Sequence, residues 1–229
     1  MSCAQAEGLT HRRVTMTCLL LPVRTGSNQQ QMGIFDIFKG LGNKNIKPFP
    51  EIEDVFSGDL DKCRKVFFPV CSIPLSEINA EWGDEPIHLV QFNEDPYNEE
   101  AAKHHNEYCK YNMIAFDLKD GRYSFKADFG YFDLTEDWEE WFNKTRESYH
   151  ASKAQYHKEG ETFGIDGLQM GGEPEWWQAD ETPLDPDGEP MHFITEFTTD
   201  TICDDSCDKK IFLFYSPKHK LAVQIYQIT

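Results

Sequence analysis

The dipeptide Asp120-Gly121 constrains the fold of this chain more than any other local feature. It follows an apolar, β-prone run over residues 113–118 and precedes residues 122–132, in which aromatic residues recur at alternate positions. Asp-Gly favours the two-residue type I′ turn, because both central residues of that turn need positive φ. The pattern therefore predicts an antiparallel β-hairpin over residues 113–132.

Five other runs have the composition of strands, and the aromatic content of the chain, 14% with 17 Phe, also favours sheets. Pro69 interrupts the first run and places it at a sheet edge or in a β-bulge, since proline cannot donate to a ladder. The last two runs flank a short polar loop and predict a terminal hairpin. The five predicted strands are residues 66–73, 87–92, 191–197, 211–215 and 221–228.

Residues 135–159 predict one long amphipathic helix. Thr135 is a suitable N-cap, and the acidic residues of the first turn suit the positive end of the helix dipole. A stripe recurs at steps of three and four residues, and we expect it to pack on the sheet, although a partner's groove would also accept it. The stripe consists of Trp138, Trp141, Phe142, Thr145, Tyr149, Ser152 and Tyr156.

Because strands outnumber helices, the predicted fold class is α+β, with one sheet-rich, mixed or antiparallel domain over residues 32–229. Residues 1–31 contain a charged region and a short apolar region, but no signal cleavage site follows. We expect a disordered leader there and a natural start at Met32. No apolar run reaches the roughly eighteen residues that cross a bilayer, so we expect a cytoplasmic protein.

The seven cysteines are odd in number and scattered, which indicates reduced thiols rather than a disulfide framework. Cys203 and Cys207 form one close pair, whose spacing suits half of a zinc site, a loop disulfide or two uncommitted thiols. A structural zinc site needs four ligands, and His104, His105 and Cys109 are candidates for the remainder. With only one close pair in the sequence, we expect no metal and no other cofactor.

Signatures of catalysis are not found in the sequence. It contains no Gly-x-Ser-x-Gly or Ser-x-x-Lys motif and no glycine-rich phosphate loop that leads into a helix. The forty acidic residues are too many for any one pair to stand out as a general acid and base. Residues 185–189 are spaced partly like a Ca²⁺ loop but lack its twelve residues, so we interpret them as a solvated acidic loop.

Residues 170–178, Met-Gly-Gly-Glu-Pro-Glu-Trp-Trp-Gln, predict a rigid turn. Two glycines permit positive φ, and the proline that follows fixes φ and removes a donor. One interpretation is a turn whose rings plug the core. The other is a small-ligand or hydrolytic pocket in which Glu173 or Glu196 acts as acid or base. The motif residues are Gly171, Gly172, Pro174, Trp176, Trp177 and Gln178.

From about residue 164 onward the chain resembles the YwqG-like family of bacterial domains of unknown function. The shared order is the Gly-Gly-x-Pro-x-Trp-x-Gln motif, an acidic Pro-rich loop, and strands at 191–197, 211–215 and 223–225. The motif is also similar, more distantly, to one in programmed-cell-death-2 type proteins, which are chaperone-like binders of a basic ribosomal protein. The resemblance implies a sheet-rich α+β fold and no defined chemistry.

The formal net charge of −18 restricts the class of partner. Residues 1–31 hold three Arg against one Glu, so residues 32–229 carry −20. Such a charge repels nucleic acids and anionic membranes and steers a basic protein inward. We therefore expect a non-enzymatic binding protein that captures a basic protein, such as an immunity protein against a bacterial toxin; the enzyme pocket above is the alternative. The expected partner-binding residues are Asp180, Glu181, Asp185, Asp187, Glu189, Asp204 and Asp205.

Overall fold

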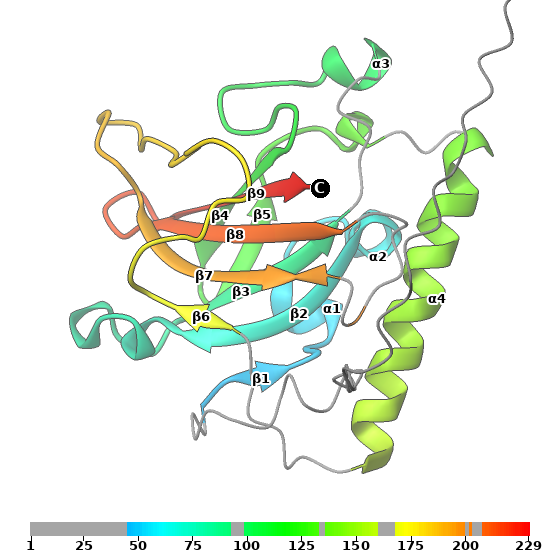
Figure 1. Cartoon of the computed structure of the whole chain (residues 1–229), viewed down its shortest axis with the longest axis horizontal. Coiled ribbons are helices and arrows are strands. Elements are labelled where there is room, and N and C mark those ends of the chain that lie inside the picture. The colour runs from blue at the N-terminus through cyan, green and yellow to red at the C-terminus, as the bar shows by residue number, and fades with distance from the viewer. Residues whose placement is uncertain (1–44, 93–98, 133–135, 160–167, 200–201, 203–207) are drawn as a thin grey trace, which may run out of the picture. The chain divides into compact units, whose positions relative to one another are not determined.

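The computed structural model describes residues 45–92, 99–132, 136–159, 168–199, 202 and 208–229. Within these residues, two antiparallel sheets and one long helix share a single apolar core, so the predicted α+β, sheet-rich class is confirmed (Figure 1). The predicted leader, residues 1–31, lies outside the described residues, and so do Asp204, Asp205, Cys203 and Cys207.

The larger sheet has six strands in the order β5-β4-β9-β8-β7-β6, and every neighbouring pair is antiparallel. The predicted terminal hairpin forms its centre. Its two strands pair without a register shift, from Lys209 opposite Ile228 to Ser216 opposite Leu221. The strands are β4 (Met113–Lys119), β5 (Arg122–Phe125), β6 (Gln169–Met170), β7 (His192–Thr198), β8 (Lys209–Ser216) and β9 (Leu221–Ile228).

The predicted hairpin turn joins β4 to β5. Asp120 has φ of 52° and Gly121 has φ of 70°, the two positive values that a type I′ turn requires. The second strand is shorter than predicted, because the chain leaves the sheet after Phe125 and forms a short 3-10 turn, η3 (Phe129–Tyr131). That departure brings Phe125 and Phe132 edge to face with the Phe67 ring, at centroid distances of 5.4 and 5.3 Å.

The smaller sheet contains β1 (Lys47–Pro48), β2 (Phe67–Pro74) and β3 (Pro86–Phe92), with β2 in the centre. Pro69 therefore lies in a central strand and not at an edge. Of the two predicted solutions the β-bulge is the observed one, because the pairing register shifts between Pro69 and Cys71. Short elements join successive strands: α1 (Ile52–Val55) and α2 (Leu60–Val66) lie between β1 and β2, and η1 (Leu75–Glu77) and η2 (Ala80–Trp82) lie between β2 and β3. The short helix α3 (Glu99–Ala102) lies between β3 and β4, where the chain passes to the larger sheet.

Side chains of the larger sheet satisfy the outer edge of β3, which no strand of the described residues pairs with. The Tyr123 hydroxyl accepts from the His88 N–H at 2.9 Å and donates to the His88 carbonyl at 2.8 Å. The amide of Gln224 does the same for Val90, at 2.8 and 2.7 Å. Lys209 Nζ donates to the Phe92 carbonyl at 3.1 Å. The backbone groups of His88, Val90 and Phe92, at alternate positions of β3, are thus hydrogen-bonded by side chains of the larger sheet.

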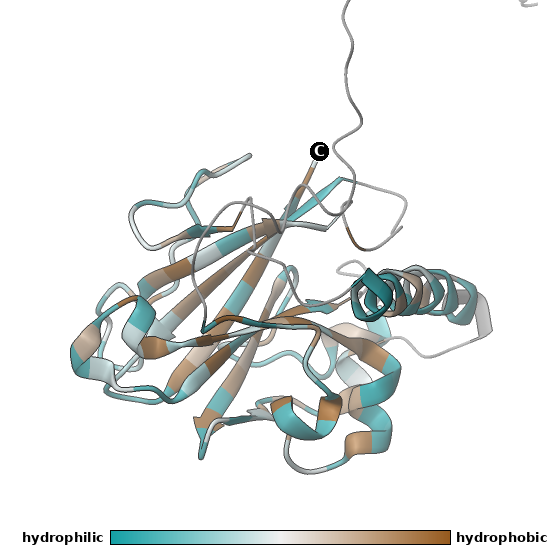
Figure 2. Ribbon diagram, turned by 90° about the horizontal axis from the view of Figure 1, so that it is seen from below, coloured by the Kyte–Doolittle hydropathy of each residue, from teal (hydrophilic) through white to brown (hydrophobic). Residues whose placement is uncertain are grey.

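The long helix α4 (Glu136–Glu159) confirms the predicted element and lies beside the smaller sheet (Figures 1 and 2). Its stripe is buried at Phe142, Thr145, Tyr149, Ser152 and Tyr156. Tyr149 contacts the Phe68 ring of β2 and donates its hydroxyl to the Pro69 carbonyl at 2.8 Å. The side chains of Trp138 and Trp141, the other two predicted members, lie outside the described residues.

His88 is fully buried in β3, and burial favours its neutral ring. Nε2 lies 2.8 Å from the Gly121 carbonyl, which can only accept, so in the neutral ring Nε2 donates and Nδ1 accepts from the Ser72 hydroxyl at 2.8 Å. Burial lowers the pKa of His88 to about 4, and the bond to Gly121 opposes that shift. Protonation below about pH 6.5 therefore favours the unfolded state.

We expect this histidine to reduce stability as the pH falls. Between its unfolded pKa of about 6.5 and its folded pKa of about 4, the unfolded state binds more protons. The free energy of unfolding should fall by about 2.5 kcal/mol from pH 7 to about pH 4.5 through this group alone. Urea titrations of wild type and His88→Asn at both pH values measure it as the difference between their pH dependences. The exposed His157→Asn should keep the wild-type dependence; equal slopes for His88→Asn would refute the assignment.

Candidate functional site

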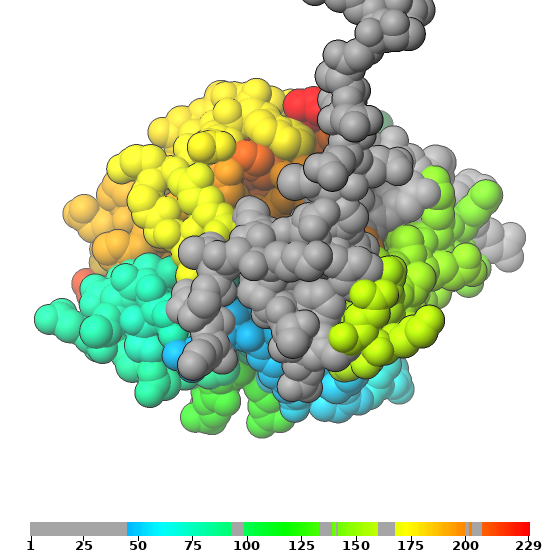
Figure 3. Space-filling view, turned by 60° about the horizontal axis from the view of Figure 1, so that its bottom comes forward, coloured from blue at the N-terminus to red at the C-terminus, as the bar shows by residue number. Residues whose placement is uncertain are grey.

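Residues 171–191 leave the larger sheet after β6 and return at β7, and we call them the acidic segment. They contain seven carboxylates and no Lys or Arg. Gly171 and Gly172 have φ of 64° and 78°, so the chain turns here as the motif predicts. The segment lies on the surface, coloured yellow to light orange in Figure 3. Its acids are Glu173, Glu175, Asp180, Glu181, Asp185, Asp187 and Glu189.

The two tryptophans of the motif lie against the larger sheet. Trp176 packs on Phe212 and Phe214, with ring centroids at 4.4 and 5.8 Å. The Trp177 ring has Lys210 Nζ at 5.4 Å from its centroid. Both indoles are partly buried. Pro174, between the glycine turn and Trp176, restricts the backbone that leads to the two rings. These contacts favour the interpretation of the motif as a turn that anchors the segment.

A buried ion pair holds the start of the acidic segment. Lys210 Nζ of β8 lies 2.7 Å from Glu196 Oε1 of β7, and their side chains are only 9% and 6% exposed. The other Glu196 oxygen accepts from the Glu175 backbone N–H at 2.7 Å, and Lys210 also donates to the Glu175 carbonyl at 3.1 Å. Glu196, a candidate acid or base in the sequence, is thus bound on both oxygens to structural partners.

The buried amide of Gln227 in β9 holds the middle of the segment. Its oxygen accepts from the backbone N–H groups of Trp177 and Gln178, both at 2.9 Å. Its nitrogen donates to the Ala179 carbonyl at 2.8 Å and to Glu181 Oε2 at 2.9 Å. One side chain therefore makes four hydrogen bonds to four successive parts of the segment. Sequence reasoning missed this residue, because a lone glutamine in a strand gives no signal of such a role.

Local donors lower the pKa values of three carboxylates of the segment, those of Asp180, Asp185 and Asp187. The Thr182 hydroxyl and N–H lower the pKa of Asp180, and Lys218 with His219 lowers the pKa of Asp187. Desolvation raises the pKa of Asp185, but the N–H groups of Glu189 and Asp187 outweigh it, so this pKa is also lowered. Glu173, Glu189 and the carboxylates of Asp180 and Asp187 are exposed to solvent.

Asp185, Asp187 and His219 could together hold a metal ion, because one ligand atom of each lies within 4.8 Å of the others. Protein side chains already contact Asp187 at this position. Lys218 Nζ lies 2.5 Å and His219 Nε2 lies 2.8 Å from Asp187 Oδ2. Asp185 also accepts from the N–H groups of Asp187 and Glu189 and from the Ser216 hydroxyl, which closes the loop on itself. We interpret the cluster as a set of contacts that stabilises the conformation of the acidic segment.

The structure brings together one serine–histidine pair that the sequence did not indicate, Ser72 with His88. Both are buried, and the histidine's low pKa makes it a weak base, so the pair stabilises the smaller sheet. Cys63, Cys71 and Cys109 are buried free thiols whose pKa values burial raises, to about 12 for Cys63 and Cys109 and further for Cys71. Such thiols are poor nucleophiles.

His104, His105 and Cys109, the candidates for the remainder of a zinc site, each contact other groups of the protein. His104 packs over Gly130 and lies 3.4 Å from Asp128, whereas His105 contacts the rings of Tyr111 and Tyr131. Cys109 Sγ is directed to the Ala115 carbonyl at 3.9 Å. The possible second pair at Cys203 and Cys207 lies outside the described residues.

Comparisons with protein-family models, with curated proteins and with solved structures found no match. In the described part of the chain, no helix combines the length and the apolar composition that crossing a membrane requires. The candidate site is therefore the acidic segment, whose seven acids lie in a stretch that a buried ion pair and a buried glutamine fix to the larger sheet.

Proposed function

We propose that this protein is a non-enzymatic binding protein that captures a basic protein partner through the acidic segment. The proposal rests on one observation: the acidic segment is strongly negative, and hydrogen bonds hold its backbone in place. Seven carboxylates and no Lys or Arg lie in 21 consecutive residues, and β8 and β9 hold that stretch by interior hydrogen bonds. An immunity protein that neutralises a basic toxin is the form of binding protein that such a surface suits best.

Fixation favours binding because it removes an entropic cost. A loop that must be ordered on association loses affinity for each residue it immobilises, whereas a preorganised loop does not. Gln227 and the Lys210–Glu196 pair order the backbone of the acidic segment in the free protein. Its exposed charges then attract a cationic surface and raise the association rate.

The acids on α1 and α2 differ from those of the segment, because neighbouring bases neutralise them. Glu53 and Asp61 pair with Arg64, and Asp54 pairs with Lys47 at 2.6 Å. The acidic segment has Lys218 as its exposed basic neighbour, since Lys210 is engaged by Glu196. The segment thus supplies, within 21 residues, seven of the twenty surplus negative charges of residues 32–229. We also propose, on the motif alone, that the chain is related to the YwqG-like domains.

The test compares two triple variants that change the net charge equally. Affinity purification of the full chain from its native cells, with mass spectrometry, identifies the partner, and calorimetry then measures its Kd at low and high salt. We expect Glu173→Gln/Asp180→Asn/Glu189→Gln to raise the Kd at least about tenfold and to reduce its salt dependence. The control Glu140→Gln/Glu147→Gln/Glu159→Gln, on exposed positions of α4, should bind like the wild type.

Two outcomes would contradict the proposal. One is that no basic protein co-purifies with the full chain. The other is that both triple variants bind an identified partner with the same Kd, because the affinity would then follow net charge and not the acidic segment.

A further inference from the structure

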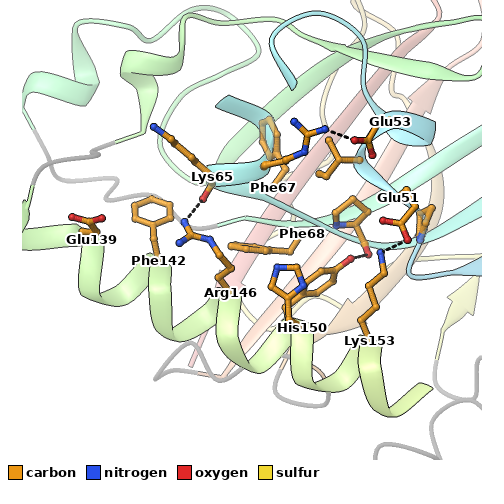
Figure 4. A pocket seen from close by; sticks show the side chains of 15 residues that line it. Glu51, Glu53, Lys65, Phe67, Phe68, Glu139, Phe142, Arg146, His150 and Lys153 are labelled. Atoms are coloured by element: carbon orange, nitrogen blue, oxygen red, sulfur yellow. Dashed lines mark hydrogen bonds and ion pairs between the residues drawn. The ribbon is translucent and has the colours of Figure 1, made fainter. Parts of the chain in front are cut away.

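A pocket of about 620 Å³ opens between α4 and the smaller sheet, on elements that the acidic segment does not touch (Figure 4). One wall is α4, from Glu139 to Lys153. The facing wall comes from the chain before α1, from α1, from α2 and from the start of β2. This volume lies within the range that small-molecule sites occupy.

The floor of the pocket is apolar and rigid. Phe68, Phe142 and Tyr149 line it, and each is at most 3% exposed. The Tyr149 hydroxyl is bonded to the Pro69 carbonyl, which fixes the ring, and the ring in turn contacts Phe68. A flat or chain-like apolar body could therefore lie on a preformed surface without disturbing the core.

The rim of the pocket carries more unneutralised positive than negative charge. Arg64 is paired with Glu53, and Lys153 is paired with Glu51 at 2.9 Å. In contrast, Arg146 has no carboxylate partner among the described residues. Its guanidinium donates to neutral oxygens, the Asn143 side chain at 2.5 Å and the Lys65 carbonyl at 3.3 Å.

Lys65 lies on the same rim as Arg146, and its ammonium group also makes no ion pair within the described part of the chain. The exposed Glu139 is the remaining acid of the lining. Beside this acid, the lining thus carries two cations that have no ion-pair partner among the described residues, in a protein whose net charge is −18.

His150 lies beside these cations in the pocket lining. Burial lowers its pKa first, and the positive charges of Lys153 and Arg146 lower it further, against the opposing effect of Glu51.

We propose that this pocket binds a small carboxylate with an apolar body, of the fatty-acid or aromatic-acid class. The carboxylate is received by Arg146, whose free donors suit a two-oxygen anion, with Lys65 beside it. The apolar body lies on Phe68, Phe142 and Tyr149. This site is separate from the acidic segment and does not depend on the proposed function.

The test uses 8-anilinonaphthalene-1-sulfonate, a fluorescent aromatic anion, as the probe of the full chain at neutral pH. We expect a saturable fluorescence increase with one site. Arg146→Gln should raise the probe's Kd by about tenfold, since a charged hydrogen-bonded contact is lost. Lys158→Gln, an equal charge change at an exposed position of the same helix, should leave the Kd unchanged. Unaltered near-UV circular dichroism confirms that both variants are folded.

Competition with three ten-carbon compounds tests the charge requirement on the wild type itself. Decanoate should displace the probe, decanol should do so at least about tenfold more weakly, and decylammonium should not compete. Equal potency of the three compounds, or an unchanged Kd for folded Arg146→Gln, would overturn the proposal. If Arg146→Gln fails to fold, the competition series decides the question without it.

Discussion

Replacing Lys210 with Met should lower the free energy of unfolding by about 3–5 kcal/mol. The substitution leaves Glu196, whose side chain is 6% exposed, as a buried carboxylate without its cation. The desolvation of that charge is then no longer compensated. Lys210 also bonds the Glu175 carbonyl, so the start of the acidic segment loses a second anchor. Urea denaturation followed by tryptophan fluorescence measures the change.

Two control variants separate the buried pair from general effects of removing a lysine. Lys218→Met breaks an exposed ion pair with Asp187 and should cost less than about 1 kcal/mol. The double variant Lys210→Met/Glu196→Leu removes both charges and should recover most of the loss. A cost below about 1 kcal/mol for Lys210→Met would show that Glu196 finds another partner or water, and that the pair does not hold the segment.

We expect Gln224→Leu to destabilise the protein by about 2–6 kcal/mol, because it leaves two buried backbone groups without a partner. The Gln224 side chain accepts from the Val90 N–H and donates to the Val90 carbonyl, and it is completely buried. Leucine has a similar volume, so the loss is of hydrogen bonds and not of packing. Urea denaturation gives the free energy, and hydrogen exchange at the Val90 amide shows where protection is lost.

Gln178→Leu is the matched control for this prediction. Gln178 also bonds a backbone carbonyl, that of Ile228 at 2.8 Å, but it is exposed, so water can replace the side chain. Its cost should stay within about 0.5–1 kcal/mol. The edge interpretation is wrong if the two substitutions cost the same, or if the Val90 amide keeps its protection in Gln224→Leu.

Local patterns predicted most of the elements of this fold. The Asp120-Gly121 turn, the terminal hairpin and the long helix are each determined by residues close together in the sequence. Such local patterns can be recognised in the sequence itself. The central position of β2 was not predictable, because Pro69 argues against it and only the bulge accommodates the ring. At the end of β5, Phe125 packs on the distant Phe67, a contact that local sequence does not reveal.

The acidic segment was recognisable from composition, but its fixation was not. Gln227 lies about fifty residues after the backbone groups that it holds, and Lys210 lies 35 residues after the carbonyl that it bonds. Likewise, the α4 residues of the pocket, such as Arg146, meet a wall that includes Lys65, which is 81 residues earlier. Polar side chains in strands look alike in sequence whether they face water or a distant backbone.

The way in which β3 ends the smaller sheet has a consequence for self-association. An edge strand with free N–H and C=O groups is a template on which another molecule can add a strand and begin an ordered aggregate. At His88 and Val90 this template is already occupied by a phenol and an amide from the same molecule. At these two positions the edge of β3 is therefore protected against the addition of a strand from another molecule, and no charged side chain is needed there.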